Sequence, residues 1–146
     1  YNYGARQMDR LMRVLKLAMV AATAVTTLGF LVAEFIPELC VSLFTTDNEL
    51  TGMAARGMRI IMCTFPIIGF QMVATNFFQS IGMAKVSIFL SLSRQMLFLL
   101  PLLFVLPLQF GVDGVWASMP VSDTVASLVT LVILVKYMRK FKNNYE

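Results

Sequence analysis

The sequence contains no histidine and only two cysteines, Cys40 and Cys63, which form no pair motif. Without histidine, a CxxC pair or an acidic metal motif, the chain cannot build a zinc site or a histidine-dependent catalytic centre. The cysteines are best explained as small apolar side chains. We therefore predict that the protein is not an enzyme and has no catalytic residues, no metal site and no cofactor.

Charge is also scarce. Charged residues make up 14% of the 146 residues and apolar residues 58%, whereas a soluble domain has about 25% charged residues. The net charge of +4 comes from basic residues at the ends of apolar runs, with no basic stripe interleaved with aromatic residues. This pattern excludes nucleic acid as the expected partner and indicates an integral membrane protein.

Four apolar runs are long enough to cross a bilayer. A helix rises about 1.5 Å per residue, so about 20 residues cross a hydrocarbon core about 30 Å thick. We predict an all-α, polytopic membrane protein in which an amphipathic helix at residues 5–16 continues into the first of four transmembrane helices. The predicted spans cover about residues 17–36, 58–81, 85–107 and 114–136.

Basic residues predict the orientation of these spans. Four lie before the first span, Lys85 lies in the turn after the second, and four follow the last span. Only Arg56 and Arg59 fall on the other side. By the positive-inside rule, both ends and the Gly82 turn are expected in the cytoplasm. The chain begins at Tyr1 without an initiator Met, so we expect a piece of a longer, multi-pass protein of the cell inner (plasma) membrane.

Polar residues within the spans lie on particular helix faces. At about 100° per residue, Gln71, Thr75 and Gln79 share one face with Thr64, while Ser87, Ser91, Arg94 and Gln95 share another. Lipid offers these groups no partner, so they are expected to face protein or a wet cavity. They could serve packing alone, or line a substrate or ion path. The candidate path residues are Gln71, Thr75, Asn76, Gln79, Arg94, Gln95 and Asp123.

Two charges lie deep inside predicted spans. Arg94 is about 14 Å from the Lys85 turn and Asp123 about 14 Å from Gly114 at the opposite side, so their depths nearly coincide. We predict that the two side chains pair, directly or through water. The pair could simply lock two helices together, or it could act in a proton- or ion-linked relay.

Several short motifs, in this order, resemble the carboxy-terminal third of a multidrug and toxic compound extrusion (MATE) transporter. They are YNYGA at residues 1–5, LFTTD at 43–47, FPIIGF at 65–70, FFQSIG at 77–82, SLSRQ at 91–95 and FGVDGVW at 110–116. The resemblance implies a twelve-span protein of two six-helix lobes, with this chain forming the last four spans, in the second lobe.

The resemblance also implies an activity. Such transporters are antiporters that export amphipathic, often cationic compounds by alternating access, coupled to a proton or sodium gradient. The implied partners are membrane lipid, the remaining helices of the parent transporter and small amphipathic substrates. Some members carry an ion-coupling carboxylate in the span that matches residues 60–81, where this chain has only Gln71, Asn76 and Gln79.

Two other functions remain open. One is a lipid-linked oligosaccharide flippase of related fold, which would need several basic residues lining its cavity, whereas only Arg94 lies within a span. The other is a non-transporting membrane scaffold whose polar faces serve packing only.

Overall fold

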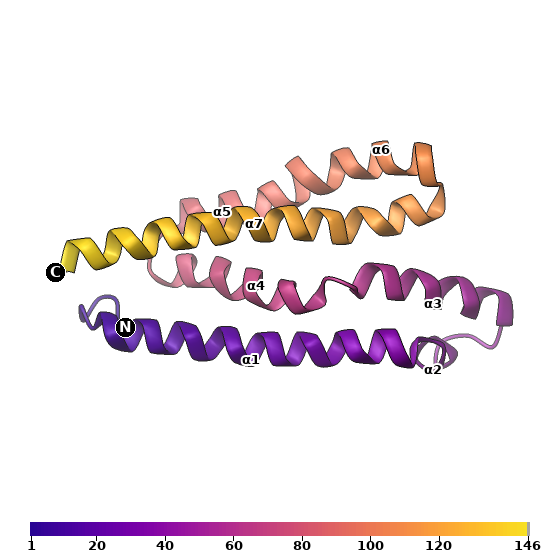
Figure 1. Ribbon diagram of the computed structural model, residues 1–146, viewed down its shortest axis with the longest axis horizontal. Helices are drawn as coiled ribbons and strands as arrows, with labels where there is room; N and C mark the ends of the chain where they lie inside the picture. The colour runs from indigo at the N-terminus through magenta and orange to yellow at the C-terminus, as the bar shows by residue number, and fades with distance from the viewer. Residues whose placement is uncertain (146) are drawn as a thin grey trace.

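The computed structural model describes residues 1–145, and these fold into eight helices and no β-strand. The helices run along one long axis (Figure 1). Both termini and the turn from α4 to α5 lie at one end, which we call the terminal end (Figure 1). The connection from α2 to α3 and the turn from α6 to α7 lie at the other, which we call the distal end.

The first helix, α1, spans Met8–Phe35 and joins the amphipathic segment to the first predicted span in one unbroken helix, although the helix begins at Met8 and not at residue 5 as predicted. It packs mainly on α4, which spans Phe65–Ser80. A Cβ atom added to Gly69 of α4 would lie 2.8 Å from the backbone oxygen of Ala22. Small residues at this crossing therefore allow close backbone approach, as is typical of membrane helices.

The second predicted span, residues 58–81, differs from a single straight helix. It contains the end of α3 (Asn48–Met62), which begins ten residues earlier than the predicted span, and all of α4; the two helices are bent by 50° relative to each other. Pro66 contributes to the break, since its ring clashes with the carbonyl group four residues earlier and it offers no N–H group to the helix. Ahead of them, α2 (Pro37–Ser42) is a short helix, and Asp47 caps α3 by accepting hydrogen bonds from Glu49 N at 2.9 Å and Leu50 N at 3.2 Å.

The third predicted span contains a π-helical segment. It runs from α5 (Ala84–Leu92) through η1 (Ser93–Leu99) into α6 (Leu100–Phe110). Pro101, two residues after the end of η1, lacks the N–H group of an α-helical bond, which favours a local change in winding. The helix also continues through Pro107, past the predicted end, and stops at Gly111, whose φ of 62° suits glycine.

The last helix, α7, spans Val112–Tyr145. By length and apolarity, α1, the α5–α6 helix and α7 could each cross a membrane, and the bent α3–α4 pair forms a fourth candidate span. Many large apolar side chains are exposed, among them Phe35, Phe104 and Leu108. This architecture is the all-α membrane fold that the sequence predicts.

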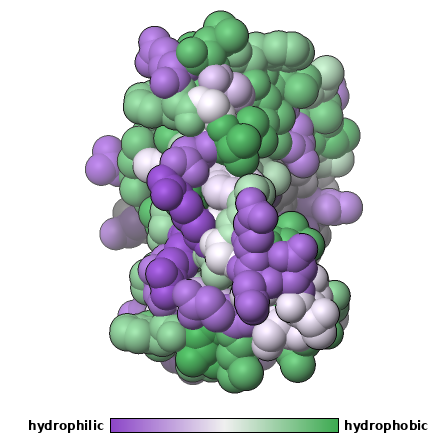
Figure 2. All heavy atoms as spheres, turned by 90° about the vertical axis from the view of Figure 1, so that its right-hand side faces the viewer, coloured by the Kyte–Doolittle hydropathy of each residue, from purple (hydrophilic) through white to green (hydrophobic). Residues whose placement is uncertain are grey.

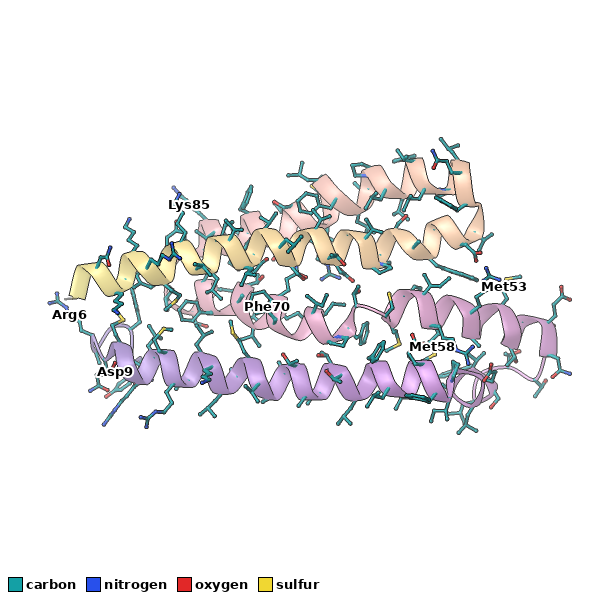
Figure 3. All side chains as sticks on the ribbon, in the orientation of Figure 1. Arg6, Asp9, Met53, Met58, Phe70 and Lys85 are labelled. Carbon is teal, nitrogen blue, oxygen red and sulfur yellow. The ribbon has the colours of Figure 1, made fainter. Side chains whose placement is uncertain are left out.

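The buried core lies mainly toward the terminal end. Phe78 and Leu90 are almost fully buried there, and the ring of Phe78 packs edge-on against Tyr137 with centroids 5.4 Å apart. In Figure 3, Arg6, Asp9 and Lys85 lie toward the terminal end, whereas Met53 and Met58 lie toward the distal end.

The distal end is more polar at its centre. Figure 2 views this end and shows a band of hydrophilic side chains bordered by apolar ones. Arg56 of α3 forms an exposed ion pair with Asp113 of α7, and Arg59 lies 3.6 Å from Glu38 of α2. These pairs join neighbouring helices at a surface that water can reach.

Candidate functional site

A polar cleft of about 210 Å³ opens between α4 and the α5–η1 segment. Five of the seven candidate path residues line it: Gln71, Thr75 and Asn76 from α4, and Arg94 and Gln95 from η1. Met72 and Ser91 complete the lining. The structure thus brings together polar groups from two predicted spans.

Helix geometry explains why these residues meet. Gln71 and Thr75 lie one turn apart on α4, and α5 returns antiparallel to α4 after the tight turn at Gly82, whose φ is 81°. The π-helical winding of η1 adds a residue to the turn and re-aims the side chains of Arg94 and Gln95. Such segments occur frequently at functional sites.

The predicted ion pair between Arg94 and Asp123 is present. Arg94 Nε donates a hydrogen bond to Asp123 Oδ1 at 2.8 Å. The Asp123 side chain is 4% exposed, whereas that of Arg94 is 30% exposed and reaches the cleft. Arg94 therefore connects the cleft to a buried carboxylate on α7.

Two hydroxyl groups support this pair. Thr64, at the break between α3 and α4, donates to Asp123 Oδ2 at 3.5 Å. Ser122 donates to the backbone oxygen of Arg94 at 3.0 Å, holding η1 against α7. The sequence pattern predicts Thr64 on the polar face of its span but no role for Ser122. The one signal for Ser122 was its position beside Asp123.

Gln71 has an unused acceptor. The residue is 3% exposed, and its Oε1 atom has no hydrogen-bond partner in the described part of the chain. The Thr75 hydroxyl cannot serve it, because it donates to the backbone oxygen of Gln71 at 2.9 Å. A buried amide oxygen without a donor costs about 1–3 kcal/mol. Gln71 thus carries an unused acceptor at the wall of the cleft, which a ligand's donor group would reach once the side chain turns into the cleft.

Two candidate residues do not line the cleft. Gln79 is exposed near the end of α4, and Asp123 lies behind Arg94. Among residues 1–145, no group of three or more His, Cys, Asp or Glu side chains could hold a metal ion. The side chains that line the cleft offer amide and hydroxyl groups and the positive charge of Arg94.

Together, the helices, their exposed apolar surfaces and the polar cleft define a multi-pass membrane protein of the transporter class. Residues 1–105 match the family model described as MatE, and the chain belongs to this family. The related proteins described next are multidrug transporters and not enzymes.

The relatives agree on the class. The chain is 23% identical to the multidrug export protein MepA of Staphylococcus aureus (strain MSSA476) over 92% of its own length and 29% of the relative's. MepA of Staphylococcus haemolyticus is also 23% identical, with the same coverage.

The fold matches a solved transporter structure. The MATE multidrug transporter DinF-BH, solved in complex with R6G, superposes with a TM-score of 0.86 and is 38% identical, over 93% of this chain and 30% of that protein. The chain therefore spans about three-tenths of the length of the relatives it matches.

Proposed function

We propose that this chain forms the last four spans, in the second lobe, of a multidrug efflux antiporter. The complete protein exports amphipathic, often cationic compounds by alternating access, using a proton or sodium gradient. The cleft residues Gln71, Thr75, Asn76, Arg94 and Gln95 line its substrate or ion path, with Asp123 behind them and Gln79 further along α4.

The single observation that carries this proposal is the cleft with its buried, unpartnered Gln71 oxygen. Amide and hydroxyl groups can hydrogen-bond to the donor groups of many amphipathic compounds. A small set of polar groups in an otherwise apolar site is the usual lining of a small-molecule pocket.

The ion pair makes the cleft compatible with cationic substrates. An unpaired Arg94 would repel a cation, but Asp123 at 2.8 Å compensates its charge. A substrate or coupling ion that approaches this pair would compete with Arg94 for the carboxylate. Such competition is a physical route by which binding could bias the packing of η1 against α7.

We further propose that the protein lies in the cell inner (plasma) membrane with its terminal end in the cytoplasm. Basic residues gather at this end, because α1 begins and α7 ends there and Lys85 lies at the start of α5, just after the turn from α4 (Figures 1 and 3). This distribution is the one that the positive-inside rule associates with a cytoplasmic side.

Dye efflux from cells that express the complete gene tests the proposal. Gln71→Leu removes the acceptor and is expected to lower the initial efflux rate of a cationic fluorescent dye about tenfold. A tenfold change corresponds to about 1.4 kcal/mol, the free energy of one buried hydrogen bond. Gln109→Leu, at the exposed end of α6, is the matched control and is expected to leave the rate unchanged. R6G, bound by the solved relative, provides a second substrate.

Two results would contradict the proposal. An unchanged rate in Gln71→Leu at normal expression would remove the cleft from the path. A complete protein that exports neither dye would favour the alternative function, a non-transporting membrane scaffold. Collapsing the proton gradient or removing sodium in the same cells identifies the coupling ion.

A further inference from the structure

A second groove lies on the opposite side of α5 from the polar cleft. It has a volume of about 490 Å³ and lies between α5 and α7 at the terminal end. Its floor is apolar and aromatic, formed by Val86, Phe89, Ile133 and Tyr137. It shares no lining residue with the cleft, because Phe89 and Ser91 lie about 200° apart around the helix.

Three ammonium groups converge on this groove. Lys85 comes from the start of α5, and Lys136 and Lys140 lie one turn apart on α7. All three are exposed, and within residues 1–145 none forms a salt bridge. Like charges one turn apart repel each other, so an anion held among them would relieve this repulsion.

The surface beyond the groove is apolar. Toward the middle of the bundle, α5 exposes Leu92 one turn after Phe89 on the same helix face, and η1 exposes Met96. Along α7, Val132, Leu128 and Val125 are exposed in the turns before Lys136. Lys136 lies eleven residues after Val125, a rise of about 16 Å and close to half the thickness of the hydrocarbon core. The groove thus joins a cationic rim at the membrane surface to an apolar track that runs inward.

We propose that this groove binds an anionic phospholipid, with its phosphate among Lys85, Lys136 and Lys140 and an acyl chain along the apolar track. Basic pockets between transmembrane helices near the membrane surface recognise such headgroups. A soluble phosphate would satisfy the lysines but would leave the track unused. The occupant is therefore a lipid. This site is separate from the substrate path proposed above and does not depend on it.

Lipid binding to the purified, full-length transporter in neutral detergent tests the proposal. The probe is dioctanoyl phosphatidylglycerol, titrated while binding is followed by thermophoresis of the labelled protein. The expected result is saturable binding that weakens about a hundredfold in the triple variant Lys85→Gln/Lys136→Gln/Lys140→Gln, and about fivefold for each single change. The corresponding Lys→Arg triple variant retains binding, because it keeps the charge.

The control is Arg6→Gln/Arg10→Gln/Arg13→Gln, which removes the same charge from the same end of the molecule but outside the groove. It is expected to bind within about twofold of the parent protein. An equal loss in this control would overturn the proposal, since attraction would then depend on net charge alone. Equally tight binding of dioctanoyl phosphatidylcholine or of inorganic phosphate would also overturn it, by removing the need for the anionic headgroup or for the acyl chain.

Discussion

Removing Arg94 alone should destabilise the protein more than removing Arg94 and Asp123 together. The Asp123 side chain is only 4% exposed, and Arg94 is its one cationic partner in the described chain. Arg94→Met keeps the length and apolar stem of the side chain but leaves a buried, uncompensated carboxylate. Breaking a buried pair in this way costs about 3–5 kcal/mol.

The reverse change should cost less. In Asp123→Asn, the guanidinium group of Arg94 remains charged, but at 30% exposure it borders the cleft and can be hydrated there. The main loss is one hydrogen bond to a charged group, about 1.5–3 kcal/mol. The double variant Arg94→Met/Asp123→Asn buries no charge, so its cost should fall below that of Arg94→Met.

The free energy of unfolding of the full-length protein, measured by denaturant titration in detergent, gives all four corners of this double-mutant cycle. The expected coupling between the two sites is at least about 2 kcal/mol. The reasoning would be refuted if the two single changes cost the same, or if their costs simply added in the double variant. Additive costs would mean that Arg94 and Asp123 are solvated independently, and equal single costs would mean that the carboxylate left by Arg94→Met is hydrated as well as the guanidinium group left by Asp123→Asn.

Two further predictions concern local packing and capping. Gly69→Ala should destabilise the protein by about 1–3 kcal/mol in the same unfolding titration, because the new Cβ would press on the α1 backbone at Ala22. Its control, Gly52→Ala on α3, meets no atom within 4 Å and should be neutral or stabilising; a harmless Gly69→Ala would contradict the close helix crossing. Asp47→Ala should cost about 1 kcal/mol and increase amide hydrogen exchange in the first turn of α3, because it removes the cap from Glu49 N and Leu50 N. Thr46→Ala should leave that exchange unchanged, and equal exchange in both variants would argue against the cap.

Some features of the site could be inferred from local sequence. The charge-free runs indicate membrane helices because apolar length is a property of each segment alone. The matching depths of Arg94 and Asp123 follow from counting residues along two antiparallel helices. These two inferences sufficed to predict the ion pair, since a charge at mid-bilayer depth needs a partner.

Other features depended on contacts between segments. The bend at Cys63 and Thr64 divides one apolar run into α3 and α4, although Pro66 near the start of a helix does not by itself require a bend of that size. The π-helical winding of η1 is stabilised by a hydroxyl from Ser122 on another helix. Gln79 shares the helical face of Gln71 yet lies outside the cleft.

The sequence by itself determined that this protein is helical and apolar enough to cross a membrane several times, and that most of its basic residues belong to one side. Those properties follow from residue type and from the constant rise of a helix, and both are local. Only the tertiary structure decided which polar groups share a cleft, which oxygen of Gln71 lacks a donor and which lysines converge between α5 and α7. The physical reason is that the crossing, bending and rotation of helices depend on side chains far apart in the chain, which no single segment encodes.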